Sequence, residues 1–159
     1  MKIILLLLVL YLLANIHSIR AQGIISKFIA DSLRYNTASC DTYKFSWQGT
    51  NQGLYMINNQ NGKRNFLTVK TSKLPDNYVT CIACCDNGQT YIGTRKGILF
   101  WDNFAFFLYN TENTDLPEND ISSLKLDHKQ DLWVKTRNCG LMKAIGHCVK
   151  LFRMHKVDD

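Results

Sequence analysis

This 159-residue chain contains six cysteines, and no other residue type in it can take part in as many kinds of chemistry. They are Cys40, Cys81, Cys84, Cys85, Cys139 and Cys148. A cysteine can pack as a small apolar group, join a disulfide or bind a metal as a thiolate. The Cys81-x-x-Cys84 spacing is that of a zinc knuckle, but no second pair of this kind accompanies it. Six cysteines allow many pairings, so the sequence leaves the connectivity open.

Three of these cysteines lie in one apolar, β-prone run over residues 79–85. Because side chains alternate along a strand, Cys81 and Cys85 share one face and Cys84 points to the other. Neighbours that point to opposite faces do not converge on one compact metal site. We therefore expect buried, apolar thiols, with some disulfides as the first alternative and a metal site as the second.

The histidines and carboxylates show no arrangement for catalysis. The histidines are His17, His128, His147 and His155. None of them has the spacing of a zinc-binding helix or stands beside a Gly-x-Ser-x-Gly pattern. The acidic residues considered are Asp86, Asp102, Asp115, Glu118, Asp120, Asp127 and Asp131. They fall mostly on expected turns, where a carboxylate accepts hydrogen bonds from the nearby backbone. We expect no enzyme, no catalytic residue, no metal ligand and no cofactor. His147 and Asp127 are the residues to substitute if an activity is measured.

A repeat of about 42 residues organises the chain. Its three copies of a strand-and-turn motif span residues 45–54, 90–98 and 132–141. The threonines Thr50, Thr94 and Thr136 follow one another at intervals of 44 and 42 residues. A second marker, Leu-Pro-x-Asn, begins at Leu74 and again at Leu116, also 42 residues apart. Two markers with one period indicate a true internal repeat.

Each copy has the pattern of short strands joined by tight turns, because apolar, β-prone runs alternate with Asn-Gly and other turn residues. In the second copy the expected strands are 79–85, 89–94, 98–101 and 104–109. In the first copy the later strands are 54–57 and 66–69, and in the third they are 121–126, 131–134, 141–144 and 148–152. No segment keeps a helical period. The sequence therefore predicts an all-β fold, a partial β-propeller of about three four-stranded antiparallel blades.

The combination of Leu-Pro-x-Asn, an apolar strand and Trp-x-Gly-Thr-x-x-Gly-Leu resembles the two-component regulator propeller repeat over about residues 35–152. That resemblance implies an extracytoplasmic sensor region of bacterial hybrid histidine kinases, common in gut Bacteroidetes, whose ligands are often glycan fragments. Two departures stand out: Tyr91 replaces the tryptophan and Lys135 replaces the glycine before the third threonine. Complete propellers usually have about four to eight blades, and this chain supplies about three. Only the binding module is therefore implied, without kinase activity.

Two sets of repeated residues could contact a ligand. The aromatic residues at one blade position are Trp47, Tyr91 and Trp133. We expect them to pack between blades, with a sugar-stacking platform as the alternative. The polar pairs between each repeated threonine and glycine are Asn51-Gln52, Arg95-Lys96 and Arg137-Asn138. These are expected to be solvated turn residues, with a site for a sugar or an anion as the alternative. The ligand-binding residues remain unassigned.

The N-terminus resembles a secretory signal. Its apolar run over residues 3–13 follows a basic start and is too short to cross the roughly 30 Å hydrocarbon core as a helix. A buried helix or a membrane anchor is the alternative. We expect a signal peptide over 1–21, a linker over 22–34 and a periplasmic or secreted protein.

The predicted organisation continues with repeats at about 35–70, 79–112 and 121–152 and a tail over 153–159. The composition, with 46% hydrophobic and 20% charged residues, is that of a globular protein. The net charge of +6 is scattered, so no nucleic-acid partner is expected. No further apolar run is long enough to span a membrane.

The leading expectation is an exported, non-catalytic propeller-repeat module that binds a carbohydrate or another small ligand in signal transduction. The alternatives are a truncated receptor fragment without independent function, and a propeller-type lyase or glycosidase. Three blades leave aromatic faces uncovered, so self-association or pairing with another propeller chain is also expected.

Overall fold

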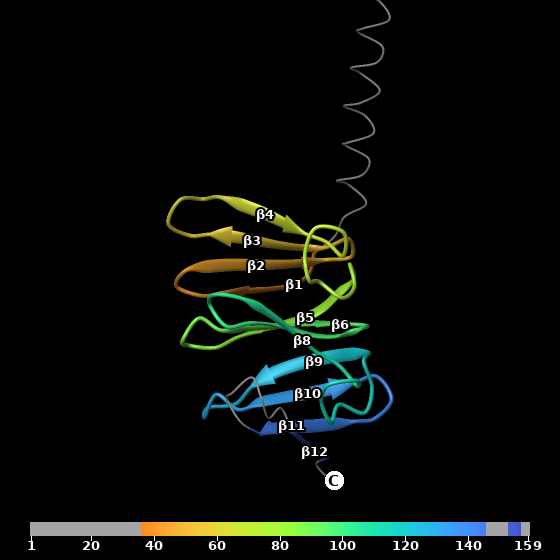
Figure 1. Ribbon diagram of the computed structural model, residues 1–159. Coiled ribbons are helices and arrows are strands. Elements are labelled where there is room, and N and C mark those ends of the chain that lie inside the picture. The colour runs from red at the N-terminus through yellow and green to blue at the C-terminus, as the bar shows by residue number, and fades with distance from the viewer. Residues whose placement is uncertain (1–35, 146–152, 157–159) are drawn as a thin grey trace, which may run out of the picture. The chain divides into compact units, whose positions relative to one another are not determined.

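The computed structural model describes residues 36–145 and 153–156, in which the regular structure is entirely antiparallel β-sheet (Figure 1). The first sheet contains β1 (Asn36–Asp41), β2 (Phe45–Thr50), β3 (Leu54–Asn58) and β4 (Arg64–Leu67). The second contains β5 (Val79–Cys84), β6 (Thr90–Thr94), β7 (Gly97–Trp101) and β8 (Phe106–Tyr109). The third contains β9 (Ile121–Leu126), β10 (Leu132–Thr136), β11 (Leu141–Ile145) and β12 (Arg153–Lys156).

In each sheet the strands lie in chain order, each paired with the next. The predicted all-β class is thus confirmed, and the arrangement is consistent with part of a propeller, although no closed propeller is formed by the described residues. Strand β1 was not predicted, because its sequence Asn-Thr-Ala-Ser-Cys-Asp has no apolar alternation. The strand predicted over 148–152 lies outside the described residues. Residues 153–156, assigned to a tail from the sequence, instead pair with β11.

One apolar cluster packs the first sheet against the second, and another packs the second against the third. Trp47 and Leu54 of the first sheet are fully buried in a cluster with Ile92 and Leu99 of the second. Tyr91 and its neighbours lie on the opposite face of the second sheet, in a separate cluster with the third. The buried members from the third sheet are Ile121, Leu124, Leu132, Val134, Met142 and Ala144. The second sheet is therefore covered on both faces.

Glycine permits the close approach of one sheet to the next. A Cβ atom at Gly49 would overlap the side chain of Val79, which begins the second sheet. A Cβ atom at Gly93 would overlap the sulfur of Cys81 and lie 3.0 Å from Cγ2 of Ile121, which begins the third sheet. The glycine before the repeated threonine is thus a requirement of packing. In the third sheet the same position holds Lys135.

The Leu-Pro-x-Asn loops also have a repeated structural role. Leu74 and Leu116 are buried, one in each inter-sheet cluster. Asn77 Oδ1 accepts a hydrogen bond from the backbone N–H of Val69 at 2.9 Å. Asn119 makes the equivalent bond to a loop N–H eight residues earlier, also at 2.9 Å. The motif therefore fixes the connection between successive sheets.

The repeated threonines close the turns that follow β2, β6 and β10. The Thr50 hydroxyl donates to the Gly53 carbonyl at 2.8 Å, and the Thr94 hydroxyl donates to the Gly97 carbonyl at 2.8 Å. The Thr136 hydroxyl accepts from a turn N–H instead. All three side chains are buried, so these threonines have a structural role.

None of the described residues forms a helix that could cross a membrane. The apolar run over 3–13, the expected signal peptide over 1–21 and the linker over 22–34 lie outside the described residues.

Candidate functional site

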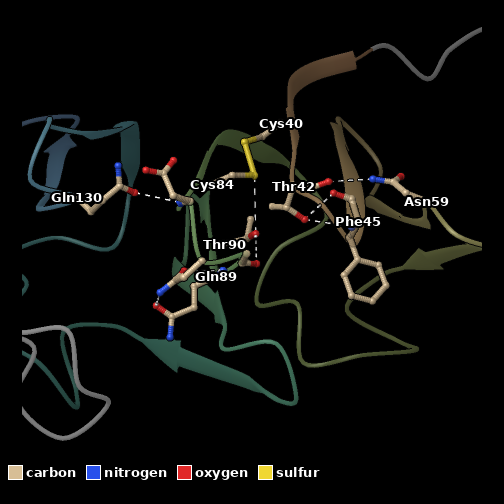
Figure 2. The surroundings of a disulfide bond; sticks show 11 residues. Cys40, Thr42, Phe45, Asn59, Cys84, Gln89, Thr90 and Gln130 are labelled. Atoms are coloured by element: carbon tan, nitrogen blue, oxygen red, sulfur yellow. Dashed lines mark hydrogen bonds between the residues drawn. A yellow bond between two sulfur atoms is a disulfide. The ribbon is translucent and has the colours of Figure 1, made fainter.

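A disulfide joins the first two sheets (Figure 2). It connects Cys40 of β1 to Cys84 of β5, whose Cα atoms are 6.1 Å apart. Cys84 points toward the first sheet, away from the face that carries Cys81, as strand alternation predicted. Because Cys84 is consumed in the disulfide, the zinc-knuckle interpretation of Cys81-x-x-Cys84 is wrong.

The thiols of Cys81 and Cys85 belong to the apolar cluster between the second and third sheets. Burial raises the pKa of each thiol to about 11, so both are neutral at physiological pH. The expectation of buried, apolar thiols is confirmed for these two residues. Cys139 is half-buried and unpaired, and Cys148 lies outside the described residues. In the described part of the chain, no three His, Cys, Asp or Glu side chains gather as a metal site.

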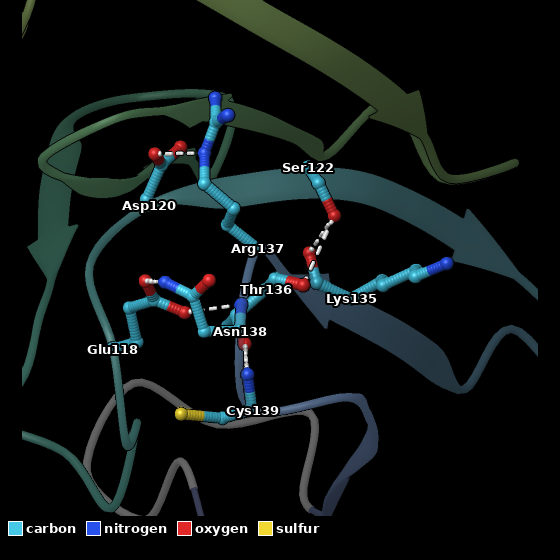
Figure 3. A network of polar contacts seen from close by, with 8 residues as sticks. All are labelled: Glu118, Asp120, Ser122, Lys135, Thr136, Arg137, Asn138 and Cys139. Carbon is cyan, nitrogen blue, oxygen red and sulfur yellow. Dashed lines mark hydrogen bonds and ion pairs between the residues drawn. The ribbon is translucent and has the colours of Figure 1, made fainter.

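Several of the polar turn residues between the repeated threonines and glycines make contacts within the protein. Arg137 Nε donates to Asp120 Oδ2 at 2.6 Å, and the Asn138 backbone N–H donates to Glu118 Oε2 at 2.8 Å (Figure 3). The Asn138 N–H lowers the pKa of the Glu118 carboxyl. These contacts tie the turn after β10 to the loop before β9, so Arg137 and Asn138 position that turn.

A similar contact holds the turn of the second sheet. The Arg95 guanidinium lies over the Tyr78 ring, 4.1 Å from its centroid. On the exposed surface this cation–π contact contributes about 0.5–1 kcal/mol. Arg95, Arg137 and Asn138 therefore make specific contacts within the protein.

The three repeated aromatic residues have different surroundings. Trp47 is fully buried between the first two sheets, and Tyr91 stacks on Phe100 with ring centroids 4.6 Å apart. The predicted packing role is confirmed for these two. Trp133 is only half-buried, and it lies on the face of the third sheet that points away from the second sheet.

A pocket of about 620 Å³ opens on this outward face. Its lining residues are Ser123, Lys125, Leu126, Asp127, Trp133, Lys135 and Leu141. Strand register accounts for most of the set: Trp133 lies opposite Lys125, and Lys135 lies opposite both Ser123 and Leu141. The pocket is thus built mainly on β9, β10 and β11. The sequence did not assign it, although Lys135 at the glycine position was the available signal.

Asp127 fixes the indole of Trp133. Its Oδ2 accepts a hydrogen bond from Trp133 Nε1 at 3.1 Å. Its Oδ1 accepts from the backbone N–H groups of Lys129 at 2.9 Å and Asp131 at 3.0 Å, which closes the β9–β10 turn. The indole bond, followed by the backbone bonds and nearby Lys143, lowers the pKa of Asp127 to about 2. This carboxylate is ionised near neutral pH and is not a general acid there.

Three lysines share the outward face, and they differ in their partners. Lys143 Nζ lies 2.7 Å from Asp131 Oδ2 and 5.4 Å from the centroid of the Trp133 ring. Asp131 raises the pKa of Lys143 through this bond. Lys125 and Lys135 are exposed, and within the described residues neither side chain forms an ion pair. Figure 3 shows Lys135 extending away from the network around Arg137.

Among the described side chains, none of the other candidates for catalysis lines this pocket. His147 lies outside the described residues, and His128 is an exposed residue of the β9–β10 turn. His155 belongs to β12, where its backbone pairs with Lys143. The carboxylates of Asp102 and Asp127 accept backbone hydrogen bonds at their own turns, as expected.

No family model and no curated protein matches the chain. Solved structures do. The extracellular domain of the putative hybrid two-component system BT3049 from B. thetaiotaomicron matches with a TM-score of 0.62 and 21% identity, over 77% of this chain and 17% of that one. The extracellular domain of the putative one-component system BT4673 from the same organism matches with a TM-score of 0.55 and 23% identity, over 67% and 15%.

PorZ, a surface component of the type-IX secretion system of Porphyromonas gingivalis, matches with a TM-score of 0.53 and 18% identity, over 68% of this chain and 17% of that one. The chain therefore spans about a sixth of the length of these proteins. At such identities the likeness is one of fold. The chain has the fold of a part of these extracellular and surface proteins.

Proposed function

We propose that this protein is an exported, non-catalytic ligand-binding module of the kind found in the extracytoplasmic regions of two-component sensors. Two observations support it. The three sheets share their fold with extracellular domains of such systems from B. thetaiotaomicron. The apolar run over 3–13, with Ala21 as the small residue before the cut, fits a signal for export to the periplasm or the medium.

The observation that carries the binding function is the pocket around Trp133. Binding sites combine an apolar surface with a few polar groups that orient the ligand. Here the half-buried indole is fixed by Asp127 and flanked by lysines. A fixed aromatic ring offers a flat apolar surface to a sugar ring, so a carbohydrate is the proposed ligand class.

The state of the best-placed acid supports the proposal that the module does not catalyse a reaction. Glycoside hydrolysis by paired carboxylates needs one acid that is protonated near the working pH. Asp127 is held ionised by four polar neighbours, and the neighbouring Asp131 is bonded to Lys143. The groups of this pocket are therefore suited to binding.

Expression of the full chain in a Gram-negative host tests both parts of the proposal. The exported form is expected to begin at Gln22 and to bind members of a carbohydrate panel. Trp133→Ala is expected to abolish binding, and Tyr43→Ala, which changes an exposed aromatic residue of the β1–β2 turn, is the matched control. Retention of the intact chain inside the cell, or carbohydrate binding that survives Trp133→Ala, would contradict the proposal.

A further inference from the structure

The outward face of the third sheet differs from the two faces that pack inside the molecule. At the row that contains the repeated aromatic residue, Trp47 has Cys40 and Met56 as cross-strand neighbours, all facing the second sheet. The corresponding residues in the second sheet, which face the third, are Ala83, Tyr91 and Phe100. In the third sheet they are Lys125, Trp133 and Lys143. The apolar neighbours have been replaced by two cations.

The position two residues further along the same strand also changes from a small residue to a cation in the third sheet. Gly49 and Gly93 leave the room that the following sheet occupies, whereas Lys135 carries a long, exposed side chain at that position. Packing a fourth sheet by the same contacts would require burial of Lys125 and Lys135. Burial of an unpaired ammonium group is strongly unfavourable. This face is therefore suited to contact with water or with an anion.

Lys125 and Lys135 are placed to act together. Lys125 lies directly opposite Trp133, and Lys135 lies two residues further along β10, so the two lysines are diagonal neighbours. Such neighbours have Cα atoms about 7–8 Å apart, within the reach of two flexible lysine side chains. The positive charge of Lys143 is offset by Asp127 and Asp131. Within the described residues, no ion pair offsets the charges of Lys125 and Lys135.

We propose that this pocket binds a carboxylated ring compound, with the ring against Trp133 and the carboxylate held by Lys125 and Lys135. The indole is already oriented by Asp127, and Leu126 and Leu141 extend the apolar lining. An ammonium group binds a carboxylate as a compact charge from several directions. The volume of about 620 Å³ is that of a small-molecule site.

This inference rests on the proposed binding function and specifies its ligand. A carboxylated ring could come from an acidic saccharide or from an aromatic acid. Both present an apolar ring surface beside a carboxylate, so the chemistry of the pocket is shared and the experiment distinguishes the two sources.

Isothermal titration calorimetry with the full chain tests the inference. The probes are oligogalacturonate with its methyl ester, and 4-hydroxybenzoate with its methyl ester. Each pair keeps the ring and removes the charge. At least one acid is expected to bind about tenfold or more tightly than its ester, because a charge-assisted hydrogen bond is lost with the carboxylate. Its affinity is expected to fall as the salt concentration rises.

The double variant Lys125→Gln/Lys135→Gln is expected to weaken binding of the acid about tenfold or more and to weaken binding of the ester much less. Both side chains are exposed, so their substitution does not threaten folding. Lys63→Gln, which changes an exposed lysine of the β3–β4 turn, is the matched control and is expected to have no effect.

Several results would overturn the inference. The first is equal affinity for acid and ester, and the second is binding of the acid that survives the double lysine variant. The third is a dimer that shields Trp133 at the concentrations used. Binding of neutral saccharides through Trp133, without a preference for acids, would overturn this inference and leave the proposed function standing.

Discussion

The interface between the first and second sheets and the outward face of the third sheet use the same repeat position in opposite ways. Trp47 is fully buried there, next to Gly49, which allows the second sheet to approach. Trp133 is half-buried there, next to exposed Lys135. The repeat specifies where an aromatic ring stands in the sheet. The residues beside the ring decide whether it packs against another sheet or faces a pocket.

The two indoles are also held by different forces. Trp47 lies among Phe45, Trp101 and Phe106, and its Nε1 has no hydrogen-bond partner among the described residues. Trp133 donates its Nε1 proton to Asp127. Packing alone therefore orients the first ring, whereas a hydrogen bond orients the second. The difference shows how one sequence motif can serve both a core and a surface.

Truncation of the two tryptophans should give the largest contrast. Trp47→Ala is expected to destabilise the protein by about 3–5 kcal/mol, because it leaves a large cavity in the inter-sheet core. Trp133→Ala is expected to cost only about 1 kcal/mol, since its ring is partly exposed. Urea denaturation of both variants measures the difference. Equal losses of stability would mean that Trp133 is also a core residue.

Removal of the disulfide should weaken the first interface alone. The bond closes a loop with a sequence separation of 44 residues, for which about 2–4 kcal/mol of stabilisation is expected. Cys40→Ser with Cys84→Ser should lower the urea midpoint and speed hydrogen exchange in β1 and β2. Exchange in β10 should change less, because no disulfide links the third sheet among the described residues. Faster exchange that is largest in β10 would contradict this account.

Substitution of the residue before the repeated threonine should affect stability more where that residue is packed between sheets than where it is exposed. Gly93→Val is expected to cost about 1–3 kcal/mol, because the new side chain would overlap Cys81 and Ile121. Lys135→Gly, the matched change on the outward face, is expected to cost at most about 1 kcal/mol, as Gly does within a strand. Chemical denaturation compares the two. A large loss from Lys135→Gly would show that this face is packed.

Acid titration should give the smallest effect. Since folding lowers the pKa of Asp127 from an unfolded value of about 3.9, its stabilising contribution is complete above that value and is lost as pH falls toward 2. The Trp133 indole should therefore change its NMR shift as the pH falls below about 3, with a midpoint near 2. Asp127→Asn should abolish this titration, with Asp86→Asn, an exposed turn carboxylate, as the control. A titration unchanged in Asp127→Asn would disprove the assignment.

The sequence was sufficient for the parts of the structure that repeat. The spacing of Thr50, Thr94 and Thr136 predicted the repeat, and the apolar runs and turn residues of each copy predicted the all-β class and most strands. Strand β1 was missed because its polar residues show no alternation. The pairing of Cys40 with Cys84 depends on the contact between two sheets, which no local pattern encodes.

The pocket was missed for a related physical reason. Lysines 125, 135 and 143 are ordinary surface residues in the sequence, and only the strand register places them around Trp133. The aromatic repeat suggested apolar faces at both ends of the array. The structure instead gives the third sheet an outward face with one tryptophan among lysines.

Trp47 and Trp133 occupy one repeat position, and their exposure to solvent differs. Incorporation of 5-fluorotryptophan tests this difference directly, because the chain has three tryptophans and Trp→Phe variants assign their fluorine resonances. On transfer from H2O to D2O, the resonance of Trp133 is expected to show a solvent isotope shift and that of Trp47 is expected to show none. Equal shifts for the two residues, or a Trp133 resonance protected at every protein concentration, would contradict the account.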